Sequence, residues 1–145
     1  MSKIVISYRR EDSQETTGRI YDRLTSHFPP GNVFRDVDNI PPGTDFRHVL
    51  EWEVGSCDVL LAIIGHRWLK VTDANGQRRL DDLDDFVRIE IETALRRDIP
   101  VIPVLVSNAP MPEAQDLPPA IRDLAYRNGR VVRPDPDFHR DMARR

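Results

Sequence analysis

Glu90 is the residue of this chain whose setting first suggests chemistry, because an aromatic residue, Phe86, stands four positions before it. On a helix this spacing places Phe86 and Glu90 on one stripe, next to the apolar stripe of Val87 and Ile91. We therefore expect Glu90 at the margin of the buried face, within the first two turns, where the helix dipole stabilises an anion. The simpler interpretation is a solvent-facing glutamate that pairs with an arginine of the same helix.

Further polar and aromatic residues follow the apolar runs that we expect to be strands. They are Tyr8, Arg9 and Arg10 after the first run, Asp36 and Asp38 after the second, and Trp68 after the third. Each also has a simpler interpretation: a strand cap and surface arginines, turn-stabilising aspartates, and a tryptophan that covers an apolar edge.

Several familiar signatures are missing from the sequence. It has no GxGxxG after the first strand, no GxxxxGK[ST], no HExxH and no GxSxG, which disfavours the usual dinucleotide, triphosphate, zinc-protease and serine-hydrolase sites. Cys57 is the single cysteine, so an internal disulfide is excluded, and no cysteine and histidine stand at metal-ligand spacing. We expect no bound metal.

Composition predicts one soluble domain spanning residues 1–145. The chain has 39% hydrophobic and 31% charged residues, and its formal charge of −3 gives no reason to expect nucleic-acid binding. Its longest apolar stretch, Val59 to Gly65, is far shorter than the ~20 residues that cross a bilayer. Without a signal-peptide pattern at residues 1–3, we expect a cytoplasmic protein that makes no membrane contact. A final helical pattern from Phe138 suggests the N-terminal domain of a longer protein, the alternative being a complete small protein.

Five apolar runs alternate with helical patterns along the chain. Strands are predicted at 3–8, 32–36, 59–64, 99–106 and 130–133, and helices at 17–28, 44–56, 84–97, 119–124 and 138–145. Pro103 places part of the fourth strand at an edge or at its own end, because proline has no donor for the ladder. This alternation predicts an α/β, flavodoxin-like, three-layer fold on a five-stranded parallel sheet. Ligands of such sheets bind beyond the carboxyl ends of the strands, so the long polar loop 66–84 is expected near the site.

Taken together and in order, these segments resemble a TIR (Toll/interleukin-1 receptor homology) domain over nearly the whole chain. The similar segments are Ile4–Arg10, the family's first conserved box; Phe34–Asp38 through Gly43, its second-strand loop; Val59–Trp68, its central strand and following tryptophan; and Asp85–Ile91, the helix that carries the glutamate of NAD⁺-hydrolysing members. The TIR family includes both enzymes and signalling scaffolds, so the fold does not decide the function.

The resemblance implies an NAD⁺ glycohydrolase that cleaves the nicotinamide–ribosyl bond and releases nicotinamide with ADP-ribose or a cyclic ADP-ribose. NAD⁺ is then the substrate and no cofactor is needed. Glu90 would be catalytic, stabilising the oxocarbenium-like ribose, and no second acid is required because nicotinamide leaves as a neutral group. The implied substrate-binding residues are Tyr8, Arg9, Arg10, Asp36, Asp38, Phe46, Trp68 and Phe86, with the arginines at the pyrophosphate and Trp68 stacked on a ring.

In the family, the Pro-Pro-Gly loop also contacts the next subunit. The resemblance therefore implies homotypic TIR–TIR self-association that completes the pocket, in a setting of innate immune, antiviral or cell-death signal transduction. Two alternatives stay open: a non-catalytic scaffold that acts by homotypic contacts, and a domain that binds a nucleotide signal without cleaving it.

Overall fold

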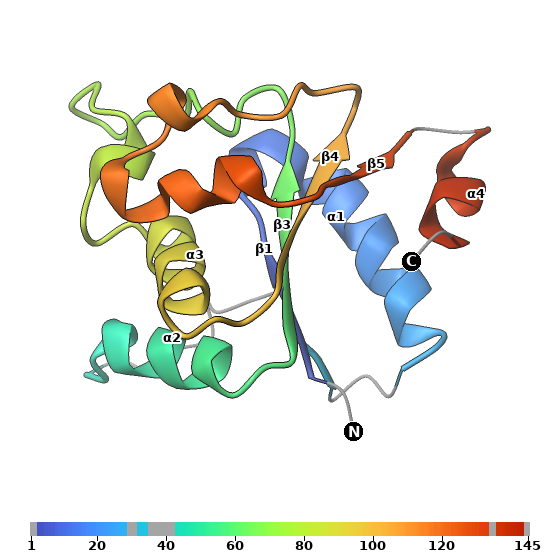
Figure 1. Ribbon diagram of the computed structural model, residues 1–145, viewed down its shortest axis with the longest axis horizontal. Coiled ribbons are helices and arrows are strands. Elements are labelled where there is room, and N and C mark those ends of the chain that lie inside the picture. Colours follow the sequence, from blue (N-terminus) through green and yellow to red (C-terminus); the bar gives the residue numbers. More distant parts are fainter. Residues whose placement is uncertain (1–2, 29–31, 35–42, 134–135, 144–145) are drawn as a thin grey trace.

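A single parallel sheet forms the centre of the protein (Figure 1). The computed structural model describes residues 3–28, 32–34, 43–133 and 136–143. The strands are β1 (Ile4–Ser7), β2 (Val33–Phe34), β3 (Val59–Ile64), β4 (Val101–Val106) and β5 (Arg130–Val132), in the order β2-β1-β3-β4-β5. This is the flavodoxin-like order, which confirms the predicted fold.

Helices cover both faces of the sheet (Figure 1). One face carries α1 (Arg10–Thr25) and α4 (Phe138–Ala143). The other carries α2 (Phe46–Gly55), α3 (Phe86–Arg96) and the 3₁₀ helix η4 (Pro119–Tyr126). Two shorter 3₁₀ helices, η2 (Arg79–Asp81) and η3 (Ala114–Asp116), lie in the connections. Asp45 and Asp85 cap α2 and α3, each accepting a backbone N–H bond from the first turn.

Alternating side chains of the strands supply two separate cores. In β1, Val5 packs with the α3 side of the molecule, whereas Ile4 and Ile6 pack with the α1 side. The same alternation in β3 sends Leu60 and Ile64 one way and Ile63 the other. Strands buried on both faces need apolar residues at nearly every position, which is why these runs are continuous.

Three predictions about the ends of helices and strands can be compared with the structure. Pro103 pairs with β3, but β5 begins to pair with β4 only at Val104, so the first half of β4 has one strand neighbour, as the proline predicted. The first helix begins earlier than predicted, at Arg10, and passes through a non-helical Ser13. The described part of the second strand ends at Phe34, and the rest of its predicted range lies outside the described residues.

The loop between β3 and α3 contains structure of its own. Thr72 bridges Arg78 in antiparallel fashion around a turn with Gly76 at a φ of +80°. After this turn, η2 leads the chain to the cap of α3. The loop is thereby held as a wall above the carboxyl end of the sheet.

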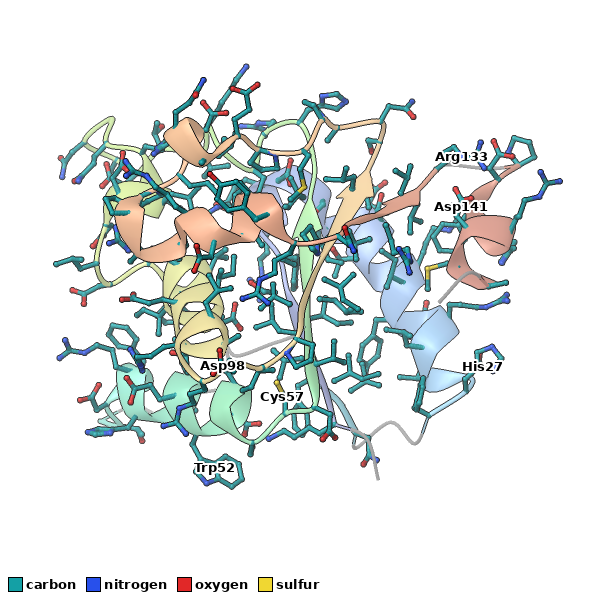
Figure 2. The ribbon with its side chains drawn as sticks, in the orientation of Figure 1. His27, Trp52, Cys57, Asp98, Arg133 and Asp141 are labelled. Atoms are coloured by element: carbon teal, nitrogen blue, oxygen red, sulfur yellow. The ribbon has the colours of Figure 1, made fainter. Side chains whose placement is uncertain are left out.

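The short α4 is tied to the end of β5 by one carboxylate. Asp141 accepts hydrogen bonds from the backbone N–H and the guanidinium of Arg133, at 2.8 and 2.9 Å, and the two side chains face each other in Figure 2. None of the helices described here combines the length and the apolar character that a membrane span requires.

Candidate active site

A cavity of about 450 Å³ opens at the carboxyl end of β1, against the first turns of α3. Five of the predicted site residues line it together: Tyr8, Arg9, Arg10, Phe86 and Glu90. The other lining residues are Ile6, Val87 and six charged ones, namely Glu11, Asp73, Arg79, Asp82, Asp84 and Asp85. This end of the sheet is where doubly wound folds bind ligands.

Glu90 lies deeper than the sequence predicted. Only 3% of the residue is exposed, so it is buried and does not sit at a helix margin. The helical pattern was interpreted with one covered face, but α3 packs against α2, η4 and the sheet. Residues almost all round its first turns are therefore buried, and Glu90 lines the cavity. No salt bridge to Glu90 forms among the described residues, so the expected pairing with a helix arginine is also absent there.

Burial raises the pKa of the Glu90 carboxyl from 4.5 to about 8. The nearby Ser7 hydroxyl and the Arg9 guanidinium lower this pKa, whereas the Asp85 carboxylate raises it. Ser7 Oγ makes no fully formed hydrogen bond, so its help to the anion is incomplete. In the empty cavity at neutral pH the group is therefore mostly protonated, and a positive charge placed beside it would favour the anion.

Arg9 does not have the position that the resemblance implied. Its guanidinium donates two hydrogen bonds to the Asp85 carboxylate, at 2.9 and 2.6 Å, and its side chain is only 2% exposed. The guanidinium is turned towards Asp85 and enclosed with it, so Arg9 is poorly placed to bind a pyrophosphate. Arg10, in contrast, is exposed at the same cavity, and Tyr8 is half-buried beside it.

Phe86 faces the cavity and is supported from behind by Phe46. The two ring centroids lie 4.9 Å apart, with the ring planes tilted by 32°. Phe46 belongs to the first turn of α2 and does not itself line the cavity. Its place is therefore to hold the Phe86 ring, which alone of the two can meet a ligand here.

The position of Trp68 contradicts the prediction that its side chain stacks on a ligand ring. The residue is fully buried and packs in the core beneath α3 and η4, with Leu80, Leu117 and Ile121 in the same cluster. The chain turns directly after Gly65 and folds the indole inward, so Trp68 fills the core in place of the cavity. Asp36 and Asp38, the remaining predicted binding residues, lie outside the described residues.

The sequence analysis missed the acidic side of the cavity. Asp82, Asp84 and Asp85 come from one aspartate-rich segment just before α3, and Asp73 comes from the turn before it. The signal was present as four aspartates in residues 81–85, but such a run is usually a solvated surface. Arg79, also in the wall, is bound to Glu11 at 2.7 Å. No group of three or more metal-ligating side chains stands together in the described part of the chain.

Asp12 is a second residue that the sequence did not reveal. Its carboxylate accepts hydrogen bonds from the backbone N–H groups of Gly65 and Arg67, at 2.8 and 2.7 Å. It thereby attaches the start of the long loop to the first turn of α1. A β-carbon at position 65 would lie 2.6 Å from the Asp12 carboxylate, so only glycine allows this approach.

Two solved structures share this fold at low sequence identity. The TIR domains of the activated Roq1 resistosome, which directly recognises the pathogen effector XopQ, superpose with a TM-score of 0.69 and 13% identity, covering 99% of this chain and 96% of that one. The Clostridium botulinum CMP N-glycosidase BcmB superposes with a TM-score of 0.50 and 15% identity, covering 97% and 96%.

Comparison at the level of sequence gives the family. No curated protein matches the chain. The model of the TIR domain family matches residues 4–140, which is nearly the entire sequence and includes every segment that carried the resemblance. The chain therefore belongs to the TIR domain family.

Proposed function

We propose that this TIR domain is an NAD⁺ hydrolase that cleaves the nicotinamide–ribosyl bond, with Glu90 as its catalytic carboxylate. Its products are nicotinamide and ADP-ribose or a cyclic ADP-ribose. Self-association with other copies activates it, and its setting is immune or cell-death signalling. The structural relatives include a TIR assembly and an N-glycosidase, which agrees with both parts of this proposal but does not by itself carry it.

The observation that carries the proposal is a buried carboxyl that lines a cavity. Glu90 has no ion-pair partner among the described residues, because Arg9 is bound to Asp85. A buried carboxyl without a cation is costly for the fold, and such groups gather at functional sites. A ligand that brings positive charge to this carboxyl would act as the cationic partner that the described residues do not provide.

The pyridinium of NAD⁺ and the oxocarbenium-like ribose that forms when it leaves both bring such charge. The Glu90 anion stabilises that positive charge where it develops, and nicotinamide departs as a neutral group without a proton donor. Water then forms the new bond to the ribose carbon and releases a proton to give ADP-ribose, or an atom of the ADP-ribosyl group does so to give the cyclic product. Phe86 offers a ring face one helical turn away. Asp82 and Asp84 make their side of the cavity acidic, so we place the nicotinamide end of the substrate there and the phosphates towards Arg10.

The decisive experiment is product analysis after incubation with NAD⁺, with particle size measured in the same samples. Glu90→Gln keeps the shape of the side chain and removes its charge, and we expect turnover to fall on the order of a hundredfold to a thousandfold. Glu92→Gln is the matched control, since Glu92 is on the same helix but lines no part of the cavity. If Glu90→Gln releases nicotinamide as fast as the parent, the assignment is wrong. Tight binding of NAD⁺ without turnover would instead indicate a nucleotide-binding domain.

A non-catalytic scaffold is the second candidate, and exposed apolar side chains favour it. Trp52, which projects from the end of α2 in Figure 2, is 67% exposed, Leu83 is 72% exposed and Tyr126 is 76% exposed. Single exposed apolar groups are common on monomers, but each of these three would be covered if another copy bound over its element. A scaffold predicts self-association with no nicotinamide release at high concentrations of protein and NAD⁺.

A further inference from the structure

The ion pair between Arg9 and Asp85 is the most enclosed charged contact in the described part of the site. The Asp85 side chain is 9% exposed and the Arg9 side chain 2%, and the two oxygens of the carboxylate each accept one guanidinium N–H. Breaking this pair to let Arg9 bind a phosphate would leave the Asp85 charge buried and alone, which is strongly unfavourable. Arg9 is therefore committed to the protein.

Asp85 joins two elements through the same carboxylate. Besides Arg9, which lies in the turn between β1 and α1 and directly precedes α1, it accepts the backbone N–H of Arg88 at 3.1 Å and so caps α3. A displacement of the carboxylate would release both the β1–α1 turn and the first turn of α3. Glu90 stands on that helix, five residues after the cap, so its position depends on this contact.

The two charges of the pair act on Glu90 in opposite directions. The Arg9 cation favours the Glu90 anion, whereas the Asp85 anion disfavours it. The other titratable or charged groups around the cavity are Tyr8 after β1, Arg10 and Glu11 on α1, and Asp73, Arg79, Asp82 and Asp84 on the loop. No charged residue of α2 or η4, the helices packed against α3, lines the cavity within the described residues.

We propose that Arg9 and Asp85 are a positioning pair that fixes the first turn of α3 against the β1–α1 turn and balances two opposite charges beside Glu90. This inference rests on the proposed function of Glu90. It removes Arg9 from the substrate-binding residues, so the phosphate contact is assigned to Arg10, which is exposed and lines the cavity. It also predicts that the opposite effects of the two charges on the ionisation of Glu90 matter for the reaction, in addition to the structural role of the pair.

Three variants separate the effect of the two charges on Glu90 from the structural role of the ion pair. Arg9→Gln removes the cation, Asp85→Asn removes the anion, and Arg9→Lys keeps the positive charge but loses the fork. Asparagine caps helices about as well as aspartate, so Asp85→Asn preserves the start of α3. Circular dichroism and thermal unfolding of each variant establish that it is folded before its site is measured.

The first measurement is the titration of Glu90 itself, followed by the ¹³C signal of its side-chain carboxyl, which Glu90→Gln identifies by removing it. Arg9→Gln should move the midpoint to higher pH, Asp85→Asn should move it to lower pH, and Arg9→Lys should leave it near that of the parent. This titration needs no turnover. It therefore tests the pair even if the protein releases no nicotinamide and the proposed function fails.

The second measurement is the pH profile of kcat/KM for NAD⁺, which reports the ionisation of the free enzyme. Because the anion is the active form, the rising limb should shift up in Arg9→Gln and down in Asp85→Asn. A merely structural pair would lower activity in both variants and leave the limb in place. Shifts in the same direction, no shift in the Glu90 titration, or an Arg9→Gln variant whose only defect is a higher KM would each overturn the proposal.

Discussion

At the scale of single residues, Glu90 makes stability depend on pH. With its pKa raised from 4.5 to about 8 by burial, the folded state keeps a proton that the unfolded chain releases within this range. The folded state thus binds more protons, so stability should fall as pH rises from about 5 to about 8, by at most about 1.4 kcal/mol per pH unit.

Urea denaturation at three pH values across that window measures this slope. Glu90→Gln cannot ionise, so its free energy of unfolding should lose that slope and exceed the parent's by a margin that grows with pH. Glu92→Gln should keep the slope of the parent. Equal slopes in the parent and Glu90→Gln would mean that the carboxyl is charged in the folded state at neutral pH.

At the scale of elements, the sequence predicted which helices and strands form, but not where α1 begins or how the elements enclose a residue. Periodicity located α3 and the neighbourhood of Phe86 and Glu90, because these depend on contacts within one helix. The depth of Glu90 depends on α2 and η4, which are distant in sequence. Partners distant in sequence also determine the positions of Arg9 and Trp68, since an arginine or a tryptophan could as readily have bound a ligand.

The long loop between β3 and α3 is a second example: the sequence predicted its length, but not the contact with Asp12 that holds its start. Asp12 binds two backbone N–H groups at the start of the loop, and its removal would leave those donors without their carboxylate. We expect Asp12→Ala to lower the free energy of unfolding by about 1–3 kcal/mol and to raise the KM for NAD⁺, because the wall of the cavity shifts.

Urea denaturation and steady-state kinetics measure these two effects. Glu15→Ala, on the exposed side of the same helix, is the matched control and should match the parent within about 0.5 kcal/mol. Gly65→Ala pushes on the same carboxylate from the opposite side and should reproduce both defects. A parent-like Asp12→Ala would mean that the loop is held by its other contacts.

At the scale of the whole molecule, the acidic loop lines the cavity, and Leu83 is exposed within that loop. An oxocarbenium-like ribose reacts with water readily, so a site that controls its product benefits from closure. A second copy bound at the rim that this loop forms would limit the access of bulk water to the ribose, leaving the one water that hydrolysis consumes, and would bury Leu83. Catalysis would then depend on self-association, so the activity per molecule should change with protein concentration.

We therefore expect nicotinamide release per mole of protein to rise with protein concentration, in parallel with the mass measured by light scattering. Leu83→Ala should shift both curves to higher concentration without changing the melting temperature, since the side chain is exposed in the single copy. Glu90→Gln should keep the mass curve of the parent and lose only the activity, which separates assembly from chemistry. If dilute, monomeric protein has the same specific activity as concentrated protein, one copy is sufficient and the rim has another purpose.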